Sequence, residues 1–249
     1  MRLLTFGDSW SYGIGAGYQD SWTLEDYHKQ KSDKDIADKY AFRTILAKEL
    51  HAEENKDFSR PGGANDTQFR RFYTNYYKVG RIDDIGYEFE PEDIILWGIT
   101  SLYRMEFLES ELNATRVYTV PREGNTFTEL YAAEYFDLNY QRFKCLYDLK
   151  HVERLCKDIG CKIIFYNFFN DHHFPDMDNF LWNGSCLLSK MIHDYDPNDK
   201  YHMSTWDDTD RKIKKAIELK LCNPFSGHPT IIGHKLIADI LLREINENT

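Results

Sequence analysis

Three short apolar runs followed by turn residues mark the most strongly patterned parts of the chain. They are RLLTF at 2–6, IILWGITS at 94–101 and CKIIFYNFF at 161–169. Runs that are apolar at nearly every position are typical of strands buried on both faces of a sheet. We therefore expect three central strands, together with a weaker strand at Lys56–Ser59.

Apolar residues recur at helical spacing in the segments between these runs. Helices are predicted over Tyr40–Leu50, from a cap at Asn65 or Asp66, over Ala132–Ile159 with Gly160 closing it, over Asp210–Leu221, and over the stretch that begins at His228. Phe143 and Ile232 are expected on the inward faces of the long helix and of the last helix.

Strands and helices alternate along the chain, and this order favours a parallel sheet with helices on both faces. We predict one α/β domain over residues 1–249, because no linker or internal repeat divides it. Residues 14–39 are glycine-rich and then charged, without a sustained period, and are expected to form an inserted excursion. The patterns at 102–130 and 170–222 predict little.

Composition narrows the function classes. The chain is 42% apolar and 29% charged, as in globular proteins, and its formal net charge of −10 argues against nucleic-acid and anionic-membrane partners. The five cysteines form no C-x-x-C pair, which favours reduced thiols over a metal or redox motif. The opening has no signal-peptide pattern and no segment is apolar enough to span a membrane, so a cytoplasmic location is expected.

Four short turns carry the residues that could do chemistry. GDSWSYG at 7–13, RPGGAND at 60–66 and WGITS at 97–101 follow successive strands, and SGHPT at 226–230 precedes the last helix. In parallel sheets the ligand site forms outside the carboxyl ends of the strands. These turns would bring a serine, two glycine turns and a histidine to one edge.

The blocks and their order resemble the SGNH, or GDSL-type, hydrolase family. Gly7-Asp8-Ser9 matches the first block, Gly62-Gly63 matches the second loosely, and His228-Pro229 matches the histidine of the fourth. The resemblance implies a three-layer flavodoxin-like fold and an esterase that acts on small acyl esters, including O-acetyl groups on sugars. It also implies Ser9 as nucleophile and His228 as base; this hydrolysis needs no cofactor, and no metal site is expected.

Backbone N–H groups of Ser9 and of Gly62 or Gly63 would then hold the oxyanion. Two positions depart from the family pattern. Thr100 stands where the third block has Asn, and its hydroxyl is the expected additional donor. Phe225 stands where the fourth block has Asp.

The missing carboxylate leaves alternatives open for orienting the imidazole. A backbone carbonyl could do so, or an acid from WDDTD, namely Asp207, Asp208 or Asp210. Asp8 is expected to support the site by satisfying turn amides.

Other histidines are expected to be structural. NDHHF at 170–174, with Asp171, His172 and His173, is interpreted as a polar loop because no third metal ligand stands at a characteristic spacing. His234 is expected to have a structural role.

Two rival hypotheses for the function remain: a catalytically silent binding or assembly module of the same fold, and a flavodoxin-like nucleotide binder.

Overall fold

The computed structural model describes residues 1–31, 33–79, 86–109, 114–170, 172–177, 179–182, 184–197 and 209–247. Its centre is a parallel sheet in the order β2-β1-β3-β6, formed by Glu54–Asp57, Arg2–Phe6, Ile94–Ile99 and Lys162–Asn167. Counted within the sheet, this is the 2-1-3-4 order of flavodoxin-like folds. The expected α/β architecture with a parallel sheet is confirmed.

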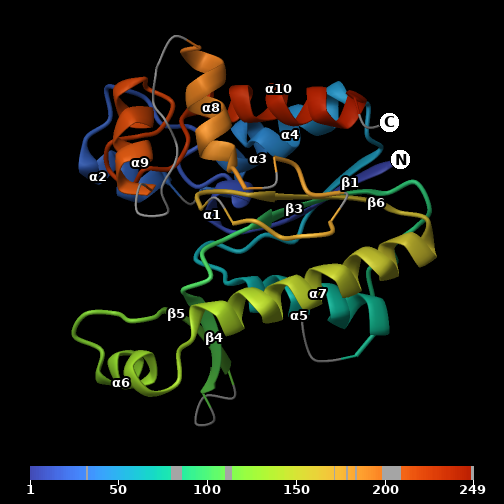
Figure 1. Ribbon diagram of the computed structural model, residues 1–249. Coiled ribbons are helices and arrows are strands. Elements are labelled where there is room, and N and C mark those ends of the chain that lie inside the picture. The colour runs from blue at the N-terminus through green and yellow to red at the C-terminus, as the bar shows by residue number, and fades with distance from the viewer. Residues whose placement is uncertain are drawn as a thin grey trace.

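Helices cover both faces of this sheet (Figure 1). One layer contains α3 (Lys34–Tyr40), α4 (Phe42–Glu49), α8 (Leu187–Tyr195), α9 (Thr209–Glu218) and α10 (Ile231–Glu247). The other contains α5 (Asn65–Tyr77) and α7 (Leu138–Ile159). The remaining elements are α1 (Ser9–Tyr12), α2 (Leu24–Gln30), the antiparallel hairpin of β4 (Arg104–Glu109) and β5 (Ala114–Thr119), and α6 (Thr126–Glu134).

The strands are apolar at successive positions because they supply two cores. On β1, Leu3 packs with α4 and α10 in one core, and Leu4 packs with α5 and α7 in the other. On β3, Leu96 and Trp97 divide in the same way, and all four side chains are fully buried. Successive side chains of a strand point to opposite faces, so an unbroken apolar run fits a sheet covered on both sides.

A close packing contact fixes the end of β3. A Cβ atom added at Gly98 would lie 2.0 Å from the Phe168 ring, which is less than any side chain could tolerate. Glycine at this position therefore allows the Phe168 ring to lie directly against the strand.

The region from 102 to 159 departs most from the sequence prediction. Residues 104–119 hold the β4–β5 hairpin, which projects beside α6 away from the sheet (Figure 1). The helix expected over Ala132–Ile159 is two helices, because Asp137 caps a new start by accepting a hydrogen bond from the Tyr140 N–H. Gly160 closes α7 in the left-handed conformation, as expected.

Three local predictions were wrong. Phe143 is 64% exposed, since it lies two residues, or about 200° around the helix, from the buried Cys145. Ile232 is 48% exposed and stands in the same relation to the buried His234. The cap of α5 is Ala64, whose N–H donates to the Thr67 hydroxyl, so neither residue expected as the cap has that role.

The excursion expected at 14–39 contains α2 and α3. Thr23 and Asp26 form a reciprocal capping box at the start of α2, and Asp33 caps α3. Within the part of the chain that the structure describes, no helix combines the length and apolarity needed to cross a bilayer.

Candidate active site

Ser9 lies at the first position of α1, directly after β1 and the Gly7–Asp8 turn. Asp8 caps this short helix, and its Oδ1 accepts a hydrogen bond from the Trp10 N–H at 3.0 Å. The turn places Ser9 at the carboxyl end of the central strand, where its side chain lines an open pocket. The expectation that Asp8 satisfies a turn amide is confirmed.

His228 lies on a tight loop between α9 and α10. The Asn223 N–H donates to the His228 carbonyl at 2.8 Å, and the Thr230 N–H donates to the Leu221 carbonyl at 2.9 Å. A Cβ atom at Gly233 would lie 2.1 Å from the Leu221 carbonyl oxygen, so glycine lets the start of α10 approach this loop. These contacts fix the backbone that carries the imidazole.

The fold brings these two side chains together across 219 residues of sequence. His228 Nε2 lies 2.8 Å from Ser9 Oγ, which is hydrogen-bonding distance. Both residues line a pocket of about 370 Å³, and Trp10, Phe169 and Ile213 supply apolar parts of its wall. A hydroxyl that faces an imidazole in a pocket is the arrangement that nucleophilic catalysis by serine requires.

The far ring nitrogen of His228 contacts a hydroxyl group instead of a carboxylate. Nδ1 lies 2.7 Å from Ser226 Oγ, and no carboxylate among the described residues forms an ion pair or hydrogen bond with the imidazole. Asp210 is exposed in the first turn of α9, and Asp207 and Asp208 lie outside the described residues. Sequence reasoning missed Ser226, for which no spacing pattern gave a signal.

Burial dominates the electrostatics of His228. It lowers the pKa of the imidazole to about 4, and the positive charges of Arg104 and Lys31 act in the same direction. The neutral Ser226 hydroxyl brings no negative charge that would favour the imidazolium. His228 is therefore neutral, and able to accept a proton, at pH 7.

Asp8, Thr100 and Arg104 form a second cluster beneath Ser9. Asp8 is fully buried, and its Oδ2 accepts hydrogen bonds from Thr100 Oγ1 at 2.9 Å and from Arg104 Nη1 at 3.0 Å. The single hydroxyl hydrogen of Thr100 is therefore used by Asp8. In this structure the Thr100 hydroxyl proton is therefore directed at the Asp8 carboxylate, and the oxyanion role expected of Thr100 stays a prediction.

The glycine turn lies alongside the Ser9 turn. The Arg60 N–H donates to the Gly7 carbonyl at 3.1 Å, which extends the parallel pairing past the end of β2. Gly63 is not a free donor, since its N–H donates to the Arg60 carbonyl at 2.8 Å. Gly62 is exposed in the left-handed region with a φ of 70°, and its N–H forms no hydrogen bond within the described residues.

A side-chain amide joins the turns that follow β2 and β3. Asn65 Oδ1 accepts a hydrogen bond from the Thr100 N–H at 3.0 Å, and its Nδ2 donates to the Thr100 carbonyl at 3.1 Å. Asn65 is buried and occupies the first position of α5. This double contact holds the glycine turn and the third block at a fixed separation.

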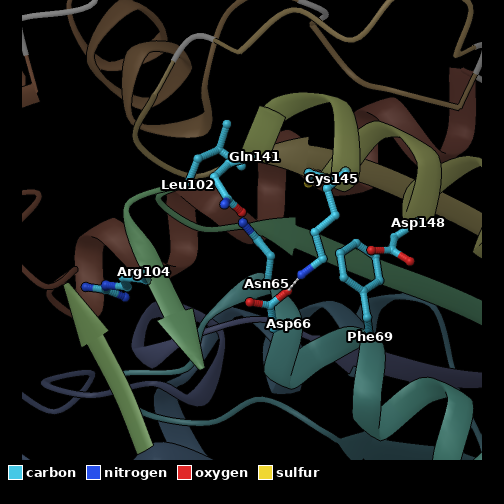
Figure 2. Close-up of a pocket in the computed structure, with 9 residues that line it drawn as sticks. Asn65, Asp66, Phe69, Leu102, Arg104, Gln141, Cys145 and Asp148 are labelled. Atoms are coloured by element: carbon cyan, nitrogen blue, oxygen red, sulfur yellow. Dashed lines mark hydrogen bonds and ion pairs between the residues drawn. The ribbon is translucent and has the colours of Figure 1, made fainter. Parts of the chain in front are cut away.

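A second pocket lies beneath this region (Figure 2). Lys144 of α7 pairs there with Asp66 of α5, and the Tyr73 hydroxyl lies 3.3 Å from Asp148 Oδ1. Arg104 lines both pockets, and Figure 2 shows its side chain directed away from Asp66 and Asp148. The second pocket is bounded by interhelical ion pairing and is separate from the Ser9 and His228 pair.

Two further histidines, His234 and His172, are buried in the protein. His234 is fully buried on α10, and its Nδ1 accepts the Phe42 N–H at the start of α4, so its expected structural role is confirmed. His172 is buried, and its carbonyl accepts a hydrogen bond from Asn167 Nδ2. Asp171 of the same stretch lies outside the described residues, among which no cluster of three or more His, Cys, Asp or Glu is suited to a metal ion.

No protein-family model matches this chain, and no curated protein matches it either. Among solved structures, the chain is similar to a carbohydrate esterase whose active site is described as displaying divergent catalytic and non-catalytic binding functions. The TM-score is 0.47 and the sequence identity 14%, over 99% of this chain and 68% of that one.

Proposed function

We propose that this protein is a serine hydrolase of carboxylic esters, with Ser9 as nucleophile and His228 as general base. The observation that supports this most strongly is the 2.8 Å contact between Ser9 Oγ and His228 Nε2 at the wall of an open pocket. The neutral state of the imidazole at pH 7 supports the same assignment, because only a neutral imidazole can take the serine proton.

The reaction proceeds in two halves. His228 Nε2 takes the Ser9 hydroxyl proton while Oγ bonds to the ester carbonyl carbon, and the carbonyl π pair moves onto oxygen. Collapse of this intermediate breaks the bond to the alcohol oxygen, which receives the proton from Nε2 and leaves. Water then attacks the acyl-enzyme, with His228 as base, and releases the acid and free Ser9.

Two backbone N–H groups are the proposed oxyanion donors. The amides of Ser9 and Gly62 form no hydrogen bond within the described residues, in contrast to Gly63. Both belong to turns at the same edge of the sheet. Each donor of this kind contributes a factor of about 10²–10³ to the rate in serine hydrolases.

The pocket favours small acyl groups. Trp10 and Phe169 pack edge to face with ring centroids 4.8 Å apart, and both line the pocket beside Ser9. A volume of about 370 Å³ is at the lower end of the range for ligand sites. Short-chain esters, including O-acetyl groups on sugars, are the proposed substrates, and the chemistry requires no cofactor.

A fluorophosphonate probe tests the assignment. The wild-type protein is expected to form one adduct, mapped to Ser9 by peptide mass spectrometry, which Ser9→Ala abolishes and His228→Ala strongly slows. Ser21→Ala and His193→Ala are matched controls at exposed positions and are expected to label like the wild type. A folded wild-type protein that takes up no probe would contradict the proposal and favour the binding-module hypothesis.

A further inference from the structure

We infer that Ser226, held by Asn223 and Tyr27, is the positioning residue for His228 and stands in the place of a carboxylate. This inference rests on the proposed function, since it concerns the orientation of the proposed base. The contact between Ser226 Oγ and His228 Nδ1, at 2.7 Å, does not by itself say which atom donates. The surrounding hydrogen bonds settle that question.

Asn223 fixes the direction of the first bond. Its Nδ2 donates to the His228 carbonyl at 2.8 Å, and its Oδ1 accepts the N–H groups of Phe225 and Ser226 at 3.1 and 3.0 Å. With two backbone donors directed at it, Oδ1 is the acceptor end of the amide. Ser226 Oγ lies 3.1 Å from the same Oδ1, so the Ser226 hydroxyl donates to Asn223.

The direction of the second bond follows. A serine hydroxyl has one hydrogen and two lone pairs, and that hydrogen is used by Asn223. Ser226 Oγ therefore accepts from His228, and the proton of the neutral imidazole resides on Nδ1. The unprotonated Nε2 then faces the Ser9 hydroxyl, which is the tautomer that a general base needs.

Tyr27 completes the group from the excursion expected at 14–39. Its side chain is 1% exposed on α2, and its hydroxyl contacts Ser226 Oγ from 199 residues away in sequence. Because the Ser226 hydrogen is already used, Tyr27 donates to the remaining lone pair. Burial raises the pKa of Tyr27, so the phenol keeps the proton that it donates.

All three partners of the Ser226 oxygen are thus neutral. A carboxylate in this place would fix the same tautomer and also stabilise the imidazolium by charge. The neutral Ser226 hydroxyl orients the His228 ring but adds no negative charge to stabilise the imidazolium. Among the residues that the structure describes, the charged groups that act on the ring are Arg104 on β4 and Lys31 after α2, and both oppose protonation of His228. The excursion therefore serves the proposed site through Tyr27.

Nitrogen NMR of ¹⁵N-histidine-labelled protein tests the inference without any need for turnover. In the wild type near pH 7, His228 is expected to be protonated on Nδ1 and unprotonated on Nε2. Ser226→Ala removes the acceptor, so a mixture of tautomers and a loss of about tenfold in kcat, the value of one neutral hydrogen bond, are expected. Ser226→Asp is expected to raise the His228 pKa by about 1 to 3.

Tyr27→Phe removes only the hydroxyl and is expected to lower kcat by about threefold, with partial loss of tautomer preference. Tyr18→Phe is the matched control, because Tyr18 packs against Tyr27 and Phe225 without a contact to Ser226 in the described residues. A wild-type His228 protonated on Nε2, or a Ser226→Ala protein with unchanged tautomer and kcat, would overturn the inference. If the probe fails to label Ser9, the proposed function falls, while the resting tautomer still decides the role of Ser226.

Discussion

The Thr100 hydroxyl donates a hydrogen bond to the fully buried carboxylate of Asp8, with 2.9 Å between Thr100 Oγ1 and Asp8 Oδ2. The contact joins the turn after β3 to the turn that carries Ser9. Burial raises the pKa of Asp8, whereas the Arg104 guanidinium and this hydroxyl oppose the rise by stabilising the charged form. Thr100 thus contributes to the architecture beneath the nucleophile.

Thr100→Val separates this structural role from an oxyanion role. The substitution keeps the shape and leaves Asp8 with one donor fewer, so a loss of about 1–3 kcal/mol in the free energy of unfolding is expected. The change in kcat/KM is expected to stay below about tenfold, whereas loss of an oxyanion donor would lower the rate by about 10²–10³. Urea unfolding and ester turnover measure the two effects.

Thr5→Val is the matched control. Thr5 is fully buried on β1, and its hydroxyl has no hydrogen-bond partner within the described residues. The same substitution is therefore expected to leave the free energy of unfolding unchanged or to increase it. A hundredfold drop in kcat/KM for Thr100→Val at unchanged stability would instead assign Thr100 to the oxyanion.

The pH dependence of turnover follows from the His228 pKa of about 4. Proton transfer from Ser9 needs the neutral imidazole, so kcat/KM is expected to be at its plateau at pH 6 and to fall as the pH drops through about 4. A base with the ordinary histidine pKa would instead lose activity as the pH drops through about 6.5. A pH profile of p-nitrophenyl acetate hydrolysis, corrected for any unfolding, distinguishes the two, and an acid limb near pH 6.5 would contradict the lowered pKa of His228.

Stability should also depend on pH, through the buried His172 and His234 and the half-buried His228. Burial lowers the pKa of His228 to about 4 and those of His172 and His234 to about 3. The unfolded chain binds these protons at about pH 6.5 and the folded chain does not, so stability is fully present above about 6.5. It is expected to decline as the pH falls from there toward 4. Urea unfolding at several pH values measures this, and His234→Gln should flatten the slope while exposed His193→Gln should not.

The thiols give an independent check on the cores. All five cysteines are free and buried, and burial raises the pKa of Cys161 to about 12 and that of Cys145 above its ordinary range. Native protein is expected to react slowly with a disulfide reagent at pH 8, and urea should release five reactive thiols. A thiol that reacts at once in the native state would place that cysteine outside the core.

The sequence was most informative where burial on both faces leaves an unbroken apolar run. β1, β3 and β6 are apolar at successive positions because both faces of the sheet are covered, and the runs were readable for that reason. The β4–β5 hairpin was not readable, since it projects from the body of the fold (Figure 1), and among its strand residues whose side chains are described only Met105 is buried. The helical pattern wrongly placed Phe143 on the inward face of the long helix, because apolar side chains also occur on the surface of folded proteins.

The site was readable in part for a different reason. Ser9 and His228 stand in short blocks with recognisable neighbours, whereas the group that holds the His228 ring depends on the folded conformation of the 223–228 loop and on the contact with Tyr27. Ser226 is two residues from His228, but this spacing alone does not predict that the serine contacts the imidazole. That role depends on the hydrogen bond by which Asn223 orients the Ser226 hydroxyl. Tyr27 lies in the charged excursion at 14–39, where no helix was expected, although the Thr23-x-x-Asp26 spacing is that of a capping box and indicates the start of α2.

The mass of the protein during turnover of p-nitrophenyl acetate tests directly whether Ser9 is the nucleophile. Rapid acid quench followed by peptide mass spectrometry is expected to find about one acetyl group per chain, on Ser9. The acetyl group should be absent from Ser9→Ala and should accumulate far more slowly in His228→Ala. Folded wild-type protein that hydrolyses the ester with Ser9 unmodified, or that carries the acetyl group on another residue, would contradict the account.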